Sequence, residues 1–582
     1  MPNLNVEVPD MVEILKSKRT LLVLASLIFF GFIFILNTFA VSDGDYFWHV
    51  NSGQWIWEHR ALPVSDPFSF PVEEINPYRP ESGRIAFILK QYWLGQLVMS
   101  SLWQMWGEAS IVVLRAFIHA GLILAIFFVS WRRSDFYRAF ILGVLTLCQF
   151  QTLGNERPVI FTFLFAFLLI WLLERITDSC RPLTKPVVVG LPLVMLVWAN
   201  IHGGYIFGLC LIAAYVVGFG FEKFRSFDRL SGKRILLLLG AGLAATANPA
   251  GFPELLTGLF AVQSGYASQV METKNTIQYF LDTKYLSHPY IPIVLLTILS
   301  LIASFRKMRP AHIVAIGGVL ILSLLAVRYE IFLFLIAPLM VAYLPFPTKQ
   351  VWAVLITIAL LFFPFLGTNF QKPLVFEASS SFPSAAVEFM RETKLAPNLF
   401  NYYDWGGYLA NRAPEYKVFI DGRGLIEEHF DQHSAVIYKE DLTILDSHEI
   451  NTAIFPIHNI VTGQVIPLSI VLSFHPDWEA VFVRDNSMIF LRNIQENKPI
   501  IDRYAIPGKT LFPILIDAYD GMLGMYPDHY RALVTKAQLQ ERVGDYAGAI
   551  NSLEKARAVN PESTYTKQTL QRLMRKKSLP RS

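Results

Sequence analysis

Charged side chains are scarce in this sequence. Asp, Glu, Lys and Arg make up 16% of its 582 residues, whereas hydrophobic residues make up 53%. A soluble globular domain carries about 25% charged residues, and the deficit here falls mainly in the first two thirds of the chain. Apolar runs long enough to cross a bilayer recur in that part. The sequence therefore predicts a polytopic membrane protein, embedded in a lipid bilayer.

Cysteine is rare as well, and basic residues form no continuous stripe. Cys148, Cys180 and Cys210 all lie in the predicted membrane portion, so no disulfide framework is predicted. Because Lys and Arg lie in short separate loops, we expect no nucleic-acid partner. The apolar stretch from Leu21 to Val41 is too long for the core of a signal peptide and lacks a small-residue cleavage site. We therefore expect it to be retained as the first span.

The apolar runs predict a mainly α transmembrane bundle. Eleven spans are expected, at residues 20–41, 111–130, 137–153, 159–174, 187–200, 204–221, 235–249, 290–305, 311–327, 331–346 and 351–367. Basic residues recur in every second connection, at 16–19, 132–133, 175–185, 223–234, 306–309 and 349. Because Lys and Arg in short loops mark the cytoplasmic side, residues 1–19 are expected to be cytoplasmic. The other connections then face outward, as does the chain after residue 367.

The predicted outward connections hold polar residues at the ends of different helices. These are Asp43, Asp45 and His49 in the first loop, Glu156 and Arg157 in the second, Asn200 and His202 in the third, and Arg328 and Glu330 in the last short one. Ionisable groups near membrane depth cost several kcal/mol unless they are paired or hydrated, so they indicate function. The sequence predicts a functional site at the outer membrane surface.

The first outward loop, residues 42–110, is long and rich in aromatic residues. Segments 46–58 and 91–106 have apolar residues at roughly helical spacing, as in helices that lie in the membrane interface. The two segments are separated by a stretch rich in turn-forming residues, Leu62-Pro63-Val64-Ser65-Asp66-Pro67-Phe68-Ser69. Asp66 is expected to stabilise this turn.

With its long first outer loop, acids just after the first span, many spans and an outer C-terminal region, the chain resembles the GT-C superfamily of membrane glycosyltransferases. More specifically, it is similar to a set of uncharacterised bacterial multi-spanning membrane proteins with a C-terminal tetratricopeptide-like unit. The shared patterns are Asp43-Gly44-Asp45…Trp48-His49, Leu62-Pro63…Asp66-Pro67-Phe68-Ser69, Arg157-Pro158, Trp198-Ala199-Asn200-Ile201-His202-Gly203-Gly204, Asn248-Pro249…Gly251, Trp405-Gly406-Gly407-Tyr408-Leu409 and Phe419-Ile420-Asp421-Gly422-Arg423. The resemblance implies a bacterial cytoplasmic membrane protein that takes sugar from a polyprenyl-phosphate-linked donor.

In the GT-C pattern an acid after the first span acts as base or binds a divalent cation, and Asp43 and Asp45 match that position. Two carboxylates separated by one Gly suit Mg²⁺ or Mn²⁺, and His49 follows about one helical turn later. The alternative is that both acids cap the helix that follows. Arg157 and Arg328 are candidates for binding the donor phosphate, unless they pair with Glu156 and Glu330 or reach the headgroups. His202, beside Asn200 and a Gly pair, is a candidate substrate contact or a structural residue.

After the bundle, which we place at 20–367, charged residues return and the pattern changes. Residues 368–504 are predicted to form a soluble α/β domain on the outer side, with strands at 417–420, 452–456 and 480–483 and a helix at 384–394. Residues 505–582 are predicted to form a helical tetratricopeptide-like unit with a basic tail, because Pro527 and Pro561 are 34 residues apart and enclose the small-residue pattern of such a repeat. Residues 527–575 could bind a protein partner.

These features favour an inverting glycosyltransferase with an acceptor, protein, lipid or glycan, on the outer side of the membrane. A polymerase or ligase of surface glycans usually has its large loop late in the span order, and a transporter would show repeats with a site at mid-membrane. The main alternative is a non-catalytic assembly or scaffold protein that acts through its outer domain and its tetratricopeptide-like unit. That alternative predicts that Asp43 and Asp45 are dispensable.

Overall fold

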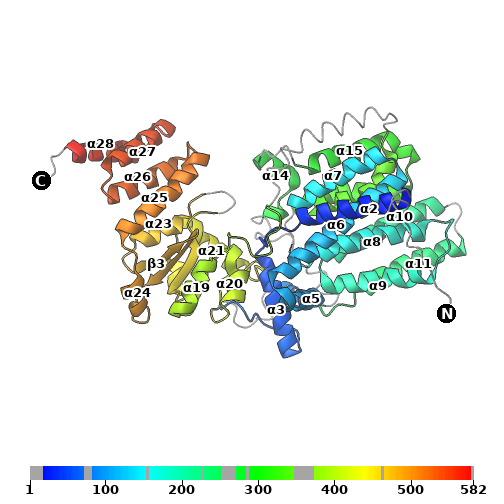
Figure 1. The fold of residues 1–582 in the computed structure, drawn as a ribbon, viewed down its shortest axis with the longest axis horizontal. Helices are drawn as coiled ribbons and strands as arrows, with labels where there is room; N and C mark the ends of the chain where they lie inside the picture. Colours follow the sequence, from blue (N-terminus) through cyan, green and yellow to red (C-terminus); the bar gives the residue numbers. More distant parts are fainter. Residues whose placement is uncertain are drawn as a thin grey trace, which may run out of the picture. The chain divides into compact units, whose positions relative to one another are not determined.

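The computed structural model describes residues 18–70, 82–152, 156–224, 228–250, 271–283, 288–345, 372–459 and 464–578. Over these residues the protein is mainly α-helical, with 24 α-helices and one four-stranded sheet (Figure 1). The chain divides into two compact units, residues 1–64 with 76–379 and residues 65–75 with 380–582. The predicted N-terminal segment, the eleventh span at 351–367, Lys349 and most of the loop after Asn248 lie outside the described residues.

The first unit contains apolar helices at ten of the predicted spans. They are α2 (Lys18–Leu36), α6 (Glu108–Arg133), α7 (Phe136–Thr152), α8 (Val159–Thr177), α9 (Lys185–Ile201), α10 (Tyr205–Lys223), α11 (Arg229–Ala244), α15 (Tyr290–Ser304), α16 (Pro310–Leu325) and α17 (Glu330–Met340). Four described segments, Glu108–Arg133, Val159–Thr177, Tyr205–Lys223 and Tyr290–Lys307, are long and apolar enough to cross a membrane, and α2, α9 and α16 are shorter apolar helices. The helices indicate a multi-pass membrane protein.

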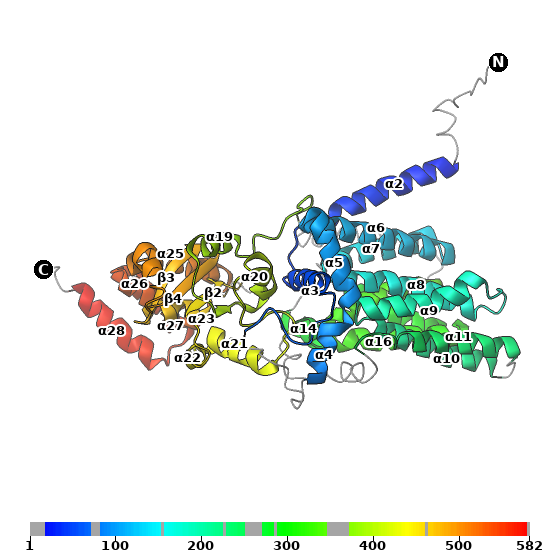
Figure 2. The same cartoon turned by 90° about the horizontal axis from the view of Figure 1, so that it is seen from below.

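The bundle helices pack closely where small residues meet. Helices α8, α9, α10 and α11 run side by side (Figure 2). At the contact of α10 with α16, a Cβ atom added to Gly218 would lie 2.2 Å from the Cα of Ala311. Only Gly allows this approach, as is common between membrane helices.

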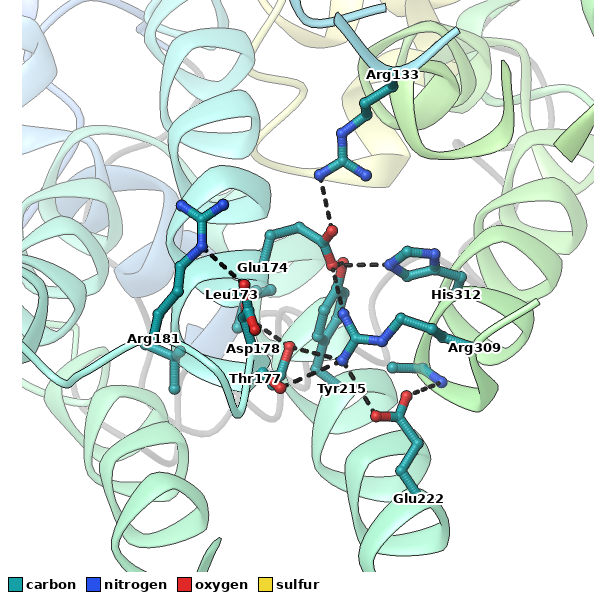
Figure 3. A network of polar contacts seen from close by, with 12 residues as sticks. Arg133, Leu173, Glu174, Thr177, Asp178, Arg181, Tyr215, Glu222, Arg309 and His312 are labelled. Carbon is teal, nitrogen blue, oxygen red and sulfur yellow. Dashed lines mark hydrogen bonds and ion pairs between the residues drawn. The ribbon is translucent and has the colours of Figure 1, made fainter. Parts of the chain in front are cut away.

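A polar network ties α6, α8, α10 and α16 together. Figure 3 shows the Glu174 carboxylate with Arg133, Arg309 and His312 directed toward it. The Arg133 Nη2 atom and the His312 Nε2 atom each lie 2.8 Å from a Glu174 oxygen, and Tyr215 donates a hydrogen bond of 2.9 Å. Arg309 also pairs with Glu222. The network fixes one end of the bundle by satisfying charges that would be costly alone.

Shorter helices connect these bundle helices. They are α3 (Asp45–His59), α4 (Ser82–Gln91), α5 (Trp93–Trp106), α14 (Thr276–Thr283), and the 3₁₀ turns η2 (Met271–Thr273), η3 (Phe305–Lys307), η4 (Val327–Tyr329) and η5 (Val341–Tyr343). The predicted helices at 46–58 and 91–106 correspond to α3 and α5, which pack on each other and lie crosswise to the bundle helices (Figures 1 and 2). A Cβ on Gly53 would lie 2.0 Å from the Gln96 carbonyl oxygen, so this packing also requires Gly.

The second unit contains a mixed sheet in the order β1-β2-β4-β3. Its strands are β1 (Leu399–Asn401), β2 (Thr452–Pro456), β3 (Trp478–Arg484) and β4 (Ser487–Arg492). β1 pairs parallel with β2, and the other two pairs are antiparallel. The predicted strands at 452–456 and 480–483 are present, but the one at 417–420 is wrong, because Val418 forms only isolated bridges to Ser69 and Leu399.

Helices complete the second unit. They are α19 (Ser384–Thr393), α20 (Gly406–Arg412), α21 (Glu427–Lys439), α22 (Thr443–Ser447), α23 (Pro467–Phe474), α24 (Lys498–Tyr504), α25 (Gly508–Met525), α26 (Tyr530–Arg542), α27 (Tyr546–Val559) and α28 (Thr564–Ser578), with the 3₁₀ turn η6 (Tyr403–Trp405). Consecutive helices from α25 to α28 pack on each other. Ala537, Ala549 and Leu553 lie in a small core there with Leu570 and Leu573. The domain boundary at 504 and the tetratricopeptide-like character of this array stay predictions.

Candidate functional site

Three carboxylates from two separate parts of the chain meet at one arginine in the first unit. The Arg157 Nε atom lies 2.8 Å from Asp43 Oδ2, its Nη1 2.8 Å from Asp45 Oδ2, and its Nη2 2.8 Å from Glu272 Oε2. Asp43 and Asp45 stand at the start of the first loop, Arg157 precedes α8, and Glu272 lies in η2. Three negative groups therefore share one guanidinium. We call these four residues the Arg157 cluster.

Local backbone contacts fix the two aspartates at the start of α3. The Asp43 Oδ1 atom accepts a hydrogen bond of 3.0 Å from the Asp45 amide, so Asp43 does satisfy one amide of the first helical turn. Its other oxygen faces Arg157. The N-cap residue of α3 is Gly44, which has no side chain to accept a bond. The Asp43 carboxylate thus both accepts a hydrogen bond at the start of α3, as the capping alternative predicted, and forms an ion pair with Arg157.

The cluster shifts the acidity of its members. Burial raises the pKa of Asp43 to about 6 and that of Asp45 to about 7, although Arg157 lowers both. Glu272 carries the opposite shift, because Arg157 lowers its pKa. Burial disfavours the charged form of Arg157, but the three carboxylates outweigh it and raise its pKa. The two aspartates are therefore poised to exchange a proton near neutral pH, as a general base must.

Glu156 lies behind the cluster and pairs with a residue that we did not predict. Its Oε1 atom forms an ion pair with Arg115 of α6, and its Oε2 accepts a hydrogen bond of 3.2 Å from the Asp43 amide. Both charged side chains are fully buried. Arg115 could have been noticed in the sequence, because an Arg inside a predicted span is costly unless it is paired or functional.

His202 lies near the cluster in a fixed orientation. Its Nδ1 atom accepts a hydrogen bond of 2.9 Å from the Gly204 amide and lies 2.9 Å from the Thr162 hydroxyl. Because Nδ1 is an acceptor, the neutral ring carries its proton on Nε2 and can donate there. Burial, with the charges of Arg157 and Arg328, lowers the pKa of His202 to about 3. His202 is therefore a hydrogen-bond donor rather than a base near neutral pH.

Arg328 is the other predicted arginine, and its surroundings differ from those of Arg157. Its Nη2 atom donates a hydrogen bond of 3.0 Å to the Tyr329 hydroxyl, and its guanidinium lies 5.0 Å from the centre of that ring. Its charge lowers the pKa of Glu272 and of His202, which places it near the cluster. No carboxylate among the described residues pairs with Arg328. Pairing with Glu330, which was the alternative to phosphate binding, is not among the described contacts of Arg328.

The remaining predicted residues have other contacts. Asn200 accepts a hydrogen bond from Trp93 and donates to the carbonyls of Leu196 and Ala247, which joins α5 and α9 to the turn after α11. Glu330 is 1% exposed and accepts a weak hydrogen bond of 3.4 Å from Gln149. His49 packs in ring contact with Trp48 and Tyr92.

The donor atoms of the cluster fit a hard cation by type, because Asp and Glu oxygens suit Mg²⁺ or Mn²⁺. Among the described residues no group of three or more His, Cys, Asp or Glu side chains already has the arrangement of a metal site. Instead, the Arg157 nitrogens supply positive charge to each carboxylate. Asp43 and Asp45 are the residues that would hold a cation next to Arg157.

Solved structures with a similar fold exist. The structure of the Archaeoglobus fulgidus oligosaccharyltransferase in complex with Zn and sulfate aligns with a TM-score of 0.50 and 12% identity, over 94% of this chain and 86% of that one. The fold is oligosaccharyltransferase-like. A second structure of that enzyme, tethered through a disulfide bond to an acceptor peptide containing an NVT sequon, has a TM-score of 0.49 and 12% identity over 76% of this chain and 70% of that one. Scans against protein-family models and curated proteins found no match.

Proposed function

We propose that this protein is a GT-C-type membrane glycosyltransferase that moves a sugar from a polyprenyl-phosphate-linked donor to an acceptor on the outer side of the membrane. The observation that carries the proposal is the Arg157 cluster, in which two aspartates with raised pKa values face a half-buried arginine. The oligosaccharyltransferase-like fold supports the same reaction class.

The reaction requires a base for the acceptor proton and positive charge for the leaving phosphate. Asp43 or Asp45 is the base in this proposal, and inversion follows when the activated acceptor attacks the face opposite the phosphate. Arg328 is the better candidate for the phosphate, since Arg157 already pairs with three carboxylates. The His202 Nε2–H group is a second hydrogen-bond donor, close enough to Arg328 for the arginine charge to lower the pKa of His202.

The proposal includes a divalent cation held by Asp43 and Asp45. When bound by Asp43 and Asp45, Mg²⁺ or Mn²⁺ would supply positive charge toward the donor phosphate. The Zn complex of the similar oligosaccharyltransferase supports a cation at this fold. Mn²⁺ binding, measured by paramagnetic resonance in the absence of any donor, tests this point. Binding that is the same in wild type and in a variant with both Asp43→Asn and Asp45→Asn would refute it.

The transfer reaction is tested directly with purified protein. A panel of radiolabelled polyprenyl-phosphate sugars is incubated with membrane extract as the acceptor source, with and without EDTA. We expect transfer by the wild type and a loss of at least about 100-fold in Asp43→Asn or Asp45→Asn. Asp228→Asn is the matched control, because Asp228 caps α11 and Asn caps helices equally well. No transfer from any donor, with full function of both variants in cells, contradicts the proposal.

The second candidate is the non-catalytic scaffold, and one observation favours it. Helices α25 to α28 form an array, and a cavity of about 580 Å³ is lined by residues of α23, α25 and α26. The predicted partner segment, 527–575, includes α26, α27 and most of α28. Function in cells that survives Asp43→Asn but not deletion of this array would favour the scaffold.

A further inference from the structure

The segment that leads from α2 to Asp43 is held by buried side chains of the bundle. We call residues 37–43 the Asp43 strap. On α6, Arg115 donates from Nε to the Asn37 carbonyl oxygen, at 3.3 Å, and from Nη2 to the Phe39 carbonyl oxygen. The ring of Phe39 stacks on the same guanidinium, with its centre 3.6 Å from the Arg115 Cζ atom. Arg115 therefore fixes the strap through two backbone contacts and one side-chain contact.

The same arginine reaches Asp43 through Glu156. Its Nη1 atom pairs with Glu156 Oε1, and Glu156 Oε2 accepts a hydrogen bond of 3.2 Å from the Asp43 amide. Both side chains of the pair are 0% exposed. Arg115 and Glu156 are 41 residues apart in sequence and contact the strap at both of its ends. Neither residue touches the reacting oxygens of Asp43 or Asp45.

The strap also contacts backbone from a later part of the same unit. The Val375 amide donates to the Thr38 carbonyl oxygen at 3.0 Å, and the Val41 amide donates to the Glu377 carbonyl oxygen at 3.0 Å. These backbone contacts set the path of the strap up to Val41, whereas the Asp43 carbonyl oxygen accepts a hydrogen bond of 3.2 Å from the Tyr46 amide of α3. Asp43 has local contacts at the start of α3, and Glu156, held by Arg115, joins its backbone amide to the bundle.

We propose that Arg115 and Glu156 are positioning residues that hold the Asp43 strap so that the Asp43 and Asp45 carboxylates meet Arg157. This inference rests on the proposed glycosyl transfer and extends it to a buried pair that contacts no substrate. A guanidinium is required at residue 115, because a Lys ammonium cannot reach two carbonyl oxygens and a carboxylate in the same geometry. A displacement of about 1 Å in catalytic groups costs about 100-fold in rate.

The chain offers a matched control for Arg115. Arg234 of α11 is 1% exposed and likewise donates to backbone carbonyls, those of Ile176, Asp178 and Arg181. It contacts none of the residues of the Arg157 cluster. Arg234→Lys removes the same kind of buried contacts as Arg115→Lys, so it reports what loss of stability alone does to transfer.

The kinetic test compares Arg115→Lys and Glu156→Gln with Arg234→Lys, each corrected for the fraction of folded protein. We expect Arg115→Lys and Glu156→Gln to lower kcat by at least about 30-fold, with the KM for the donor changed by less than about threefold. Arg234→Lys should leave both within about threefold. A wild-type kcat in Arg115→Lys, or an equal loss in Arg234→Lys, would overturn the inference.

A second measurement does not depend on activity. Hydrogen exchange of the peptide covering residues 37–46, in nanodiscs, should become at least about tenfold faster in Arg115→Lys and in Glu156→Gln, and should not change in Arg234→Lys. Unchanged exchange in the first two variants overturns the inference even when the wild type transfers sugar. Absence of transfer in the wild type instead rejects the proposed function, so the two failures are distinguishable.

Discussion

The Arg157 Nη1 atom lies 2.8 Å from the Asp45 carboxylate, although 112 positions separate the two residues in the sequence. Glu156, next to Arg157 in the chain, faces away and pairs with Arg115 instead. In the turn before α8, the adjacent and oppositely charged Glu156 and Arg157 therefore contact different partners. One partner pair is fully buried and stays neutral overall, whereas the other, with Glu272 included, has more negative groups than positive ones. Burial first, and this excess of carboxylates second, raise the pKa values of Asp43 and Asp45 and make a proton available near neutral pH.

The first prediction concerns the pH dependence of transfer. A general base must be ionised, so the rate should rise with pH as Asp43 and Asp45 lose their protons. Since burial raises the pKa of Asp43 to about 6 and of Asp45 to about 7, the midpoint of the acid limb should lie between these values. Glu272 raises both pKa values by like charge. Glu272→Gln should therefore move the midpoint to lower pH, and a midpoint near 4 in the wild type would argue against either aspartate as base.

The second prediction concerns Arg157. Arg157→Gln leaves three carboxylates without their shared guanidinium, and we expect the free energy of unfolding to fall by about 2 kcal/mol and transfer to fall below detection. Thermal unfolding in detergent and the transfer assay measure the two effects. Arg133→Gln is the control, because Glu174 keeps His312 and Arg309 when Arg133 is lost. Equal destabilisation in both variants would show that the cluster has no special dependence on Arg157.

The third prediction separates Arg328 from Arg157. The described contacts of Arg328 are one hydrogen bond and one ring contact, both with Tyr329, so Arg328→Gln should lower the free energy of unfolding by less than about 1 kcal/mol. If Arg328 binds the donor phosphate, its loss removes a charge-assisted hydrogen bond of about 1.5–3 kcal/mol, and the KM for the donor should rise by about 10- to 100-fold. Arg60→Gln is a suitable control, since the Arg60 guanidinium also has an aromatic partner, 5.2 Å from the centre of the Trp57 ring. An unchanged KM in Arg328→Gln would place the phosphate elsewhere.

The sequence was informative about helices, because helix formation depends on local composition, whereas the predicted sides of the membrane stay a prediction. The apolar run at 159–174 became α8, Val159–Thr177, and Asp43, Asp45 and Arg157 were predicted on the same face. Partners were less predictable. Which residue Arg157 contacts depends on the rotation and depth of helices that are far apart in sequence. Arg115 lies within the apolar run predicted as the span 111–130, so the sequence did not single it out. Glu272 stands in a three-residue 3₁₀ turn, where no periodicity marks it.

The same limit explains β1 and the failed strand at 417–420. β1 has three residues, too few for an alternating pattern, and pairs only with β2. Residues 417–420 have the apolar composition of a strand. However, the Phe419 amide donates a hydrogen bond to the Asn401 side chain, and only Val418 forms bridges. Side-chain hydrogen bonds of this kind compete with a ladder and are not visible in composition.

The fourth prediction concerns the second unit, in which Arg423 pairs with two aspartates at once. Its Nη1 atom lies 2.8 Å from Asp66 Oδ1, and its Nη2 lies 2.5 Å from Asp421 Oδ2, with all three side chains at most 3% exposed. Asp66 also accepts hydrogen bonds from the amides of Phe68 and Ser69. The Asp66 turn, which sequence alone marks only as a turn, is therefore anchored to the segment that follows α20.

Asp66→Asn keeps the shape of the side chain but removes its charge from this buried site. We expect the free energy of unfolding of the second unit to fall by about 3 kcal/mol, because breaking a buried ion pair costs more than making it gains. Hydrogen exchange of the β2 and β4 amides in the full-length protein measures the loss. Asp485→Asn, in an ion pair with Arg484 whose side chains are more than 60% exposed, should change stability by less than about 0.5 kcal/mol. If both variants have the same small effect, Asp421 alone suffices for Arg423, and the Asp66 turn is held by its backbone contacts.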